Sequence, residues 1–265
     1  MKPFLAVLTR ELRILFGTPL AWGALGAFSL VTALLFWLEL LSFEVAQQRA
    51  MAVNDPSVLS LLDFNDLLFG SVLVHSQILL IFVVPLLTMR LFADETRQGT
   101  MELLLSAPVR TSHVVLGKIS GVFVILGLMG AVLLLYPALL QVFGRAAVQG
   151  DGVVDWGQAL LGVTGVVACG ALYASIGAAI SAGTKSPSVA ALVTGLSLVG
   201  VWFGASTASG AEGLAGPVLS WMGPGQHMER MARGILALPD VVYFASGVVA
   251  FTFIAHRLVE NGRRA

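Results

Sequence analysis

Long apolar runs dominate this sequence, and short polar segments separate them. Six runs approach the length of about 20 residues that a helix needs to cross about 30 Å of hydrocarbon. They lie at residues 19–38, 67–89, 119–141, 158–180, 188–208 and 240–256. Asp240 opens the last run, where its carboxylate can accept hydrogen bonds from the first free N–H groups. The pattern predicts an all-α polytopic membrane protein with six transmembrane helices in a single transmembrane domain, residues 1–265.

Composition supports the membrane assignment. Hydrophobic residues make up 57% of the chain and charged residues 11%, with a mean hydropathy of +0.89. Soluble domains carry about 25% charged residues. The formal net charge is zero, which gives no basic surface for nucleic acid. No predicted polar segment is long enough for a soluble catalytic domain, so we expect a chain that is not an enzyme and binds no cofactor of its own.

The positions of lysine and arginine predict the orientation in the membrane. With the N terminus inside, the inner segments are residues 1–18, 90–118, 181–187 and 257–265, and they hold 11 of the 15 basic residues. The outer segments hold the other 4. Because basic residues are enriched on the cytoplasmic side, both termini are predicted to be cytoplasmic.

Two short amphipathic helices are predicted outside the spans. Near the N terminus, apolar residues recur every three or four positions, at Phe4, Leu8, Leu12 and Leu15. Such a helix would lie among lipid headgroups, although it could also extend the first span. A break at 17–19 favours a separate helix. Before the sixth span, Met228, Met231, Ile235 and Leu238 share one helical face, which predicts an outer surface or re-entrant helix.

The charged segment 93–118 interrupts two apolar runs. Its sequence predicts a helix that carries acidic and basic residues into the cytoplasm, a bend, and a second short turn. The residues concerned are Asp94, Glu95 and Arg97, then Gly99, Thr100 and Glu102, with Pro108 as a stop. Lys118 would mark re-entry into the membrane. Two interpretations stay open: the acidic residues pair with a partner protein, or they pair locally with Arg97 and Arg110.

The segment LFADETRQGTMELLLSAPVRTSHVVLGK resembles the loop between spans 2 and 3 of ABC-2 type permeases. The resemblance is carried by Glu95, Arg97, Gly99, Thr100, Glu102, Leu103, Leu104, Pro108, Gly117 and Lys118. Arg97 stands one position later than the usual basic residue. More narrowly, GQHMERMARGILALPDVVYF (225–244) resembles the corresponding stretch of gliding-motility-associated permeases, through His227, Glu229, Gly234, Asp240 and Tyr243.

This resemblance implies the permease subunit of an ATP-binding cassette (ABC) transporter, an exporter by family expectation. Its partners would be two ATP-binding subunits, which hold ATP and magnesium, and a second permease copy or paralogue in the lipid. A gliding-type system would add a large periplasmic partner. Residues 94–106 would form the coupling helix, with Glu95 and Glu102 transmitting motion, Gly99 as the bend and Arg97 as a polar contact. The alternative is a membrane scaffold that transmits force or a signal without a translocated substrate.

A few polar and small residues within or near the spans have two interpretations. His75 and Gln77 would line a transport path or form hydrogen bonds between helices. Gly200 and Gly204, four positions apart, would serve the same path or close helix packing. On the outer helix, His227, Glu229 and Asp240 favour structural hydrogen bonds, and no ligand spacing supports a metal site.

Overall fold

The computed structural model describes residues 2–53, 65–99, 110–143, 154–208 and 215–264, and these residues form a helical bundle. The long helices are α2 (Pro19–Val53), α4 (Ser71–Thr88), α7 (Thr111–Phe143), α8 (Trp156–Ala182), α9 (Pro187–Ala208) and α12 (Leu238–Arg264). The short ones are α1 (Lys2–Gly17), the π-helical turn η1 (Asn65–Gly70), α5 (Ala93–Arg97), α10 (Ala215–Met222) and α11 (Pro224–Ala232). Six segments are long and apolar enough to span a membrane, so the predicted fold class is confirmed.

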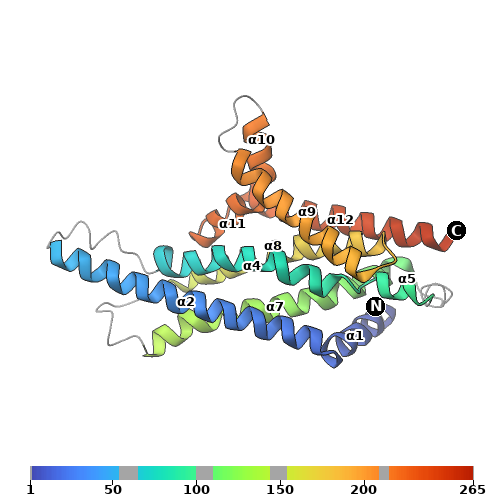
Figure 1. The fold of residues 1–265 in the computed structure, drawn as a ribbon, viewed down its shortest axis with the longest axis horizontal. Helices are drawn as coiled ribbons and strands as arrows, with labels where there is room; N and C mark the ends of the chain where they lie inside the picture. The colour runs from blue at the N-terminus through green and yellow to red at the C-terminus, as the bar shows by residue number, and fades with distance from the viewer. Residues whose placement is uncertain (1, 54–64, 100–109, 144–153, 209–214, 265) are drawn as a thin grey trace.

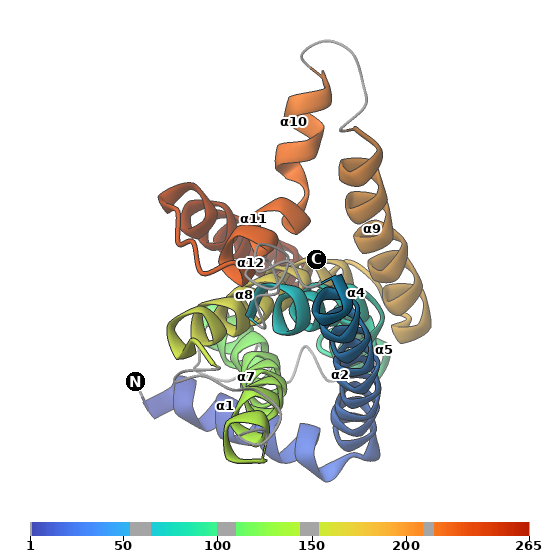
Figure 2. The ribbon, with the colours of Figure 1, turned by 90° about the vertical axis from the view of Figure 1, so that its left-hand side faces the viewer.

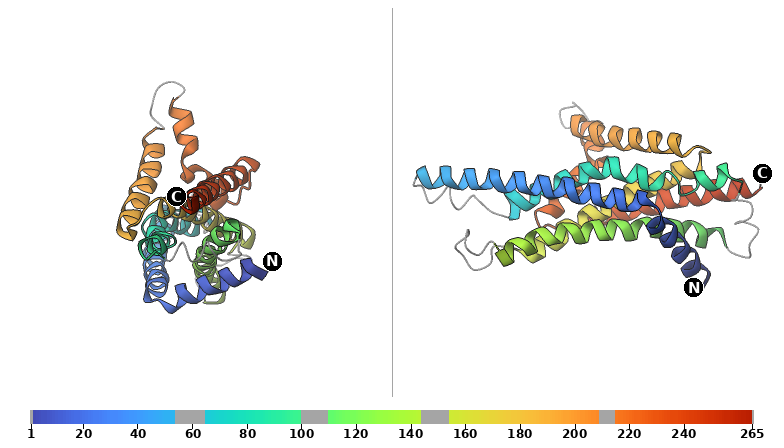
Figure 3. Two further views of the ribbon diagram at one scale, coloured as in Figure 1. Left: turned by 90° about the vertical axis from the view of Figure 1, so that its right-hand side faces the viewer. Right: turned by 60° about the horizontal axis from the view of Figure 1, so that its bottom comes forward.

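The bundle has two distinct ends. Both termini lie at the same end as α5, and this is called the α5 end (Figure 1). The start of α8 lies at the other end, called the η1 end, where Gln158 donates to Asp66 of η1 over 2.6 Å. Figure 2 and the left view of Figure 3, which look along the bundle, show α9 at its edge and α10 projecting from one side.

Three helices extend well beyond the predicted spans. One is α12, which was predicted to end at residue 256 and continues to Arg264; the others are α2 and α7. The first span was predicted to end at residue 38, whereas α2 continues to Val53. Its extra residues, ELLSFEVAQQRAMAV, contain no glycine or proline and mostly favour helix, so nothing in them ends it. The third was predicted to start at residue 119, whereas α7 starts at Thr111. Loss of hydrophobicity marks where a helix leaves the membrane, but not where it ends.

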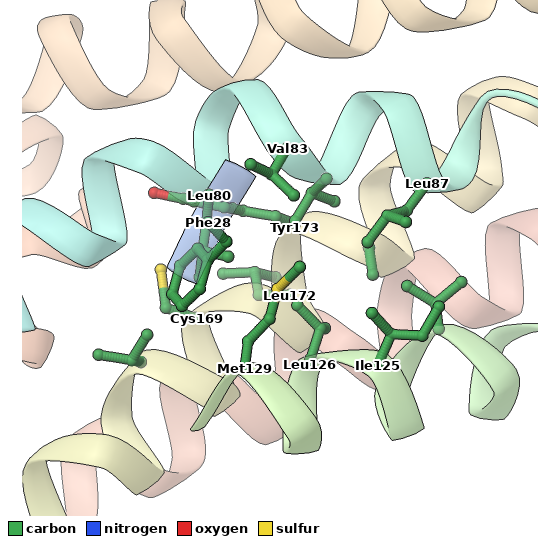
Figure 4. Packing of buried hydrophobic residues seen from close by; sticks show 14 of the residues in the cluster. Phe28, Leu80, Val83, Leu87, Ile125, Leu126, Met129, Cys169, Leu172 and Tyr173 are labelled. Carbon is green, nitrogen blue, oxygen red and sulfur yellow. The ribbon is translucent and has the colours of Figure 1, made fainter. Parts of the chain in front are cut away.

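Helices α4 and α8 form the centre of the bundle. Their most apolar windows are each 61% buried, against 17% for those of α2, α9 and α12. Figure 4 shows how the core side chains interlock. They come from α2 (Phe28), α4 (Leu80, Val83, Leu87), α7 (Ile125, Leu126, Met129) and α8 (Cys169, Leu172, Tyr173). This core fixes the central helices, while the outer three keep broad surfaces for lipid or protein.

Glycines on α8 permit its close approach to neighbouring helices. A Cβ atom added to Gly177 would lie 2.2 Å from Thr88 Oγ1 of α4, and one added to Gly170 would lie 2.9 Å from Leu126 Cδ2 of α7. Such contacts are shorter than van der Waals distances, so a larger residue at either position would force a neighbouring side chain to shift. By contrast, Cβ atoms at Gly200 and Gly204 would meet no atom within 4 Å. Those two glycines of α9 do not mediate close packing within the described chain.

The N-terminal helix α1 is separate from α2, and the predicted break is present at Thr18. It does more than lie among headgroups, because it crosses the start of α7. A Cβ atom at Gly117 would lie 2.7 Å from Val7 Cγ1, and one at Gly121 would lie 3.2 Å from Leu15 Cδ1. The two glycines of α7 therefore form the surface against which α1 packs.

We predict that Gly177→Leu destabilises the bundle, whereas Gly127→Leu on α7 does not. A side chain at 177 must displace Thr88, which is β-branched and buried, and such overpacking costs about 1–3 kcal/mol. Gly127 has no atom within 4 Å of an added Cβ. Thermal unfolding of the detergent-solubilised protein would measure the difference, and equal midpoints for the two variants would contradict this account of the packing.

Candidate functional site

A buried ionic cluster lies at the α5 end. Lys118 Nζ lies 2.8 Å from Glu11 Oε1 and 3.1 Å from Glu95 Oε1. The lysine side chain is 3% exposed and that of Glu95 14%. Arg10 adds a second cation, 3.6 Å from Glu95. The four charges, called the α5 cluster, sum to zero. Arg10 is half-exposed, and the neutral sum makes the burial of the other three energetically tolerable.

The α5 cluster joins three segments that are distant in sequence. Glu11 comes from α1, Glu95 from the first turn of α5, and Lys118 from the second turn of α7. The Phe92 ring lies 5.7 Å from Lys118 Nζ and covers the cation from the side of the α4–α5 turn. Removing Lys118 would leave Glu11 buried without its ion-pair partner, which is costly in a protein interior.

A second attachment fixes α5 to α8. The backbone N–H groups of Phe92 and Ala93 donate to Ser181 Oγ over 3.1 and 3.2 Å. The same hydroxyl donates to the carbonyl oxygen of Met89 over 3.2 Å. Ser181 is fully buried and lies near the end of α8. The sequence does not reveal this role of Ser181, because a serine in a run of small residues gives no signal of it.

The outer side of α5 carries charges that face solvent. Arg97, 60% exposed, pairs with Asp94 over 3.1 Å, and Arg90 lies 3.8 Å from Asp94. Gly99 adopts a φ of +69°, the left-handed conformation that commonly follows the end of a helix. Thr100, Glu102 and Pro108 lie outside the described residues.

The structure shows which groups Glu95 contacts. Of the two interpretations of the sequence pattern, pairing within the chain is observed, with Lys118 and Arg10, while docking to a partner stays a prediction. Lys118 lies inside α7, which already begins at Thr111, so it does not mark the start of that helix. Spacing along the chain could not reveal this pairing, since Glu11 and Lys118 are 107 positions apart.

A second buried cluster joins α10, α11 and α12. His227 Nδ1 lies 2.6 Å from Asp240 Oδ1, and His227 Nε2 lies 2.9 Å from the carbonyl oxygen of Trp221. Arg230 Nε donates to Asp240 Oδ2 over 3.1 Å, and its Nη2 contacts Oδ1. The His227 ring stacks on Tyr243 with centroids 4.0 Å apart. His227, Arg230, Asp240 and Tyr243 are called the α11 cluster.

Local sequence explains how the α11 cluster assembles. His227 and Arg230 are three positions apart and so share one side of α11. After α11 the chain reverses at Gly234, whose φ of +75° favours glycine. Asp240 then lies in the first turn of α12, where a helix N-terminus favours an acidic residue. The hydrogen bond from Arg230 to Asp240 raises the pKa of Arg230, so this cation is permanent.

The remaining residues of the predicted outer helix are arranged differently. Glu229 pairs with Arg233 over 2.5 Å on the surface, apart from the α11 cluster. Met228 and Met231 are buried against α8, as their shared face predicted. The predicted helix was too long, however: α11 ends at Ala232, and Ile235 and Leu238 are exposed. Gly234 ends the helix before the apolar pattern does.

The polar residues of the second span separate into two environments. His75 Nδ1 lies 2.8 Å from the carbonyl oxygen of Ser71 in its own helix and 3.6 Å from Glu39 Oε1. Gln77 is buried, and its Nε2 has no hydrogen-bond partner. It borders a cleft of about 260 Å³, which Trp202, Glu229 and the 223–226 turn also line. Among the described residues, no group of three or more His, Cys, Asp or Glu side chains is arranged to hold a metal ion.

Six membrane-length helices and an amphipathic helix packed across one of them define an α-helical integral membrane protein. Residues 59–231 match the family described as ABC-2 family transporter protein, a range that covers most of the chain from before η1 into α11. The chain therefore belongs to the ABC-2 transporter family, whose members are permease subunits of ABC transporters. A comparison with curated proteins gives no match. The resemblance of segment 93–118 is thus confirmed at the level of the family.

We predict that Asp240→Asn destabilises the protein far more than Glu229→Gln. Both substitutions remove one negative charge, but Asp240 is buried and bonded to both His227 and Arg230, and breaking such a buried ion pair costs about 3–5 kcal/mol. Glu229 belongs to an exposed pair, worth about 0.5 kcal/mol. Thermal unfolding in detergent provides the comparison. Similar midpoints for the two variants would show that the α11 cluster contributes little to stability.

Proposed function

We propose that this chain is the permease of an ABC exporter in a bacterial inner membrane, with both termini in the cytoplasm. A separate pair of ATP-binding subunits would hydrolyse ATP with magnesium, and their movement would be received by α5 and the segment after it. The observation that carries the proposal is the position of α5. Its outer side presents Asp94 and Arg97 to solvent, while its inner side is attached to three helices through buried groups.

The attachments of α5 suit a helix that transmits movement. Through Lys118 it is tied to α7 and α1, and through Ser181 it is tied to α8. Buried ion pairs and hydrogen bonds resist separation, since either partner alone would be costly to leave unpaired. A displacement of α5 would therefore move the ends of α7 and α8 with it, and α8 packs at the centre of the bundle. An exposed, loosely held loop could not act in this way.

The remaining parts of the proposal rest on the family and on the outer helices. The most apolar windows of α2, α9 and α12 are only 17% buried, which leaves surfaces for lipid and for a second permease copy or paralogue. Because both termini lie at the α5 end, contact of α5 with a cytoplasmic ATPase would place both termini in the cytoplasm, in agreement with the distribution of basic residues. The gliding-motility subfamily and a large periplasmic partner are supported by the motif around His227 alone.

A charge reversal at Arg97 tests docking. We expect Arg97→Glu to lower co-purification with the co-expressed ATP-binding subunit by about tenfold, because it inverts an exposed charge on α5. The matched control is Arg257→Glu on α12, whose side chain is equally exposed at 59%. Glu102→Arg extends the test into the segment after α5. Unchanged co-purification for both test variants would contradict docking at this segment.

A second test concerns transmission rather than docking. Lys118→Gln should leave co-purification intact but reduce substrate-stimulated ATP turnover in vesicles by about tenfold, a factor typical of coupling between two sites. Lys118→Arg should retain most of the turnover, and Lys185→Gln, which removes an exposed lysine from the α8–α9 turn, should retain all of it. Normal turnover in Lys118→Gln would exclude the α5 cluster from coupling. Turnover that no transported molecule stimulates, even in the unaltered complex, would favour the scaffold alternative.

A further inference from the structure

The histidine of the α11 cluster has a hydrogen-bond acceptor at each ring nitrogen. Nε2 lies 2.9 Å from the backbone carbonyl oxygen of Trp221. A carbonyl oxygen can only accept, so Nε2 must carry a proton to form this bond. If Nε2 were unprotonated, its lone pair would face those of the oxygen at a distance that gives repulsion.

The other ring nitrogen faces a carboxylate. Nδ1 lies 2.6 Å from Asp240 Oδ1. Arg230 contacts both oxygens of Asp240, which keeps that group ionised and therefore unable to donate. Arg230 Nη2 also lies 3.0 Å from Nδ1, but a donation from Arg230 would still leave Nδ1 and Oδ1 with facing lone pairs. A proton on Nδ1 removes that repulsion.

Neither neutral tautomer of His227 can satisfy both neighbours, because each carries a proton on one nitrogen only. We infer that the α11 cluster is a proton-binding site, in which His227 is held as the imidazolium cation. In this form His227 donates hydrogen bonds that join α11 to the end of α10 and to the start of α12. The inference does not depend on the proposed transport function. It assigns to the histidine of this motif a role that transport does not require.

The groups around His227 suit a cation. Asp240 supplies a full negative charge from α12. The positive charge of Arg230 on α11 disfavours a second cation, but it is paired with both oxygens of the same carboxylate. The Tyr243 ring of α12 stacks on the imidazole at an interplanar angle of 14°, an arrangement in which an aromatic face attracts a cation. The carbonyl of Trp221 lies near the end of α10, where the helix dipole is negative.

The cluster also satisfies the end of α10. Tyr243 Oη donates to the carbonyl oxygen of Met222 over 2.5 Å, next to the bond that His227 makes with Trp221. Carbonyl groups at a helix end have no partner within the helix. Two side chains from later segments thus provide donors for α10, and one of these donors exists only while Nε2 is protonated and correctly placed.

A dependence on pH follows. When α11 and α12 separate, His227 enters solvent, where imidazole loses its proton near about pH 6.5. Above that pH the form in which α11 and α12 are in contact binds one more proton than the form in which they are apart. Rising pH therefore favours their separation, and falling pH favours their contact. Stability from this site should therefore be complete in mild acid and be lost as the pH rises.

The proton can be observed directly by NMR of protein labelled with ¹⁵N-histidine in lipid nanodiscs. At about pH 7.5, where free imidazole is mostly neutral, we expect one of the 4 histidines to show both ring nitrogens protonated. Loss of that signal in His227→Gln assigns it. If this variant does not fold, His75→Gln, His113→Gln and His256→Gln assign it by elimination. A neutral tautomer for His227 at this pH would overturn the inference.

Thermal unfolding between about pH 6 and about pH 9 gives an independent readout. We expect the stability difference between the unaltered protein and His227→Gln to shrink as the pH rises, because only the histidine can lose its charge. His256→Gln, at the other end of the bundle, should show no such trend. A difference that stays constant over this range would contradict proton binding at His227, even if the variant is unstable at every pH.

Discussion

Charged groups buried in so apolar a chain must be neutralised where they lie, and this constraint shapes both ends of the bundle. At the α5 end, Lys118 lies between Glu11 and Glu95, and the three belong to different helices. At α11, Asp240 lies between His227 and Arg230. A lone buried charge costs far more than a paired one, so each cluster favours the arrangement in which its helices lie together.

The sequence predicts the helical architecture well, since the signals for it are local. A run of about 20 apolar residues indicates a span regardless of its neighbours, and all six runs became helices. The break between α1 and α2 and the apolar face of Met228 and Met231 were equally local. Helix ends were predicted less well: the residues after position 38 are polar enough to leave the membrane yet remain helical to Val53.

The ionic clusters were predictable only in part, and sequence distance explains why. His227 and Asp240 are 13 positions apart, within one helix–turn–helix segment, and the motif had already suggested structural hydrogen bonds for both. The pairs of Lys118 and the hydrogen bonds of Ser181 connect residues about 90 or more positions apart. Nothing in the spacing of charges near Glu95 distinguishes an inward from an outward side chain. That distinction requires knowing that α1 crosses α7, which depends on the whole fold.

Helix α8 is bonded to α5 near its end and to α11 near its start, so it can carry movement from one end of the bundle to the other. At 1.5 Å per residue its 27 residues extend over about 40 Å, close to the full thickness of a bilayer. Ser181 near its end fixes α5, while Gln158 near its start donates to the carbonyl oxygen of Ala232 at the end of α11 over 3.0 Å. Between these points, side chains of α4, α7 and α11 occupy the space beside its glycines, which leaves little room for the helix to bend. In the proposed permease, a push on α5 would thus be carried along α8 as the shift of a whole helix. The α11 cluster, at the far end, is where that shift would be resisted or released.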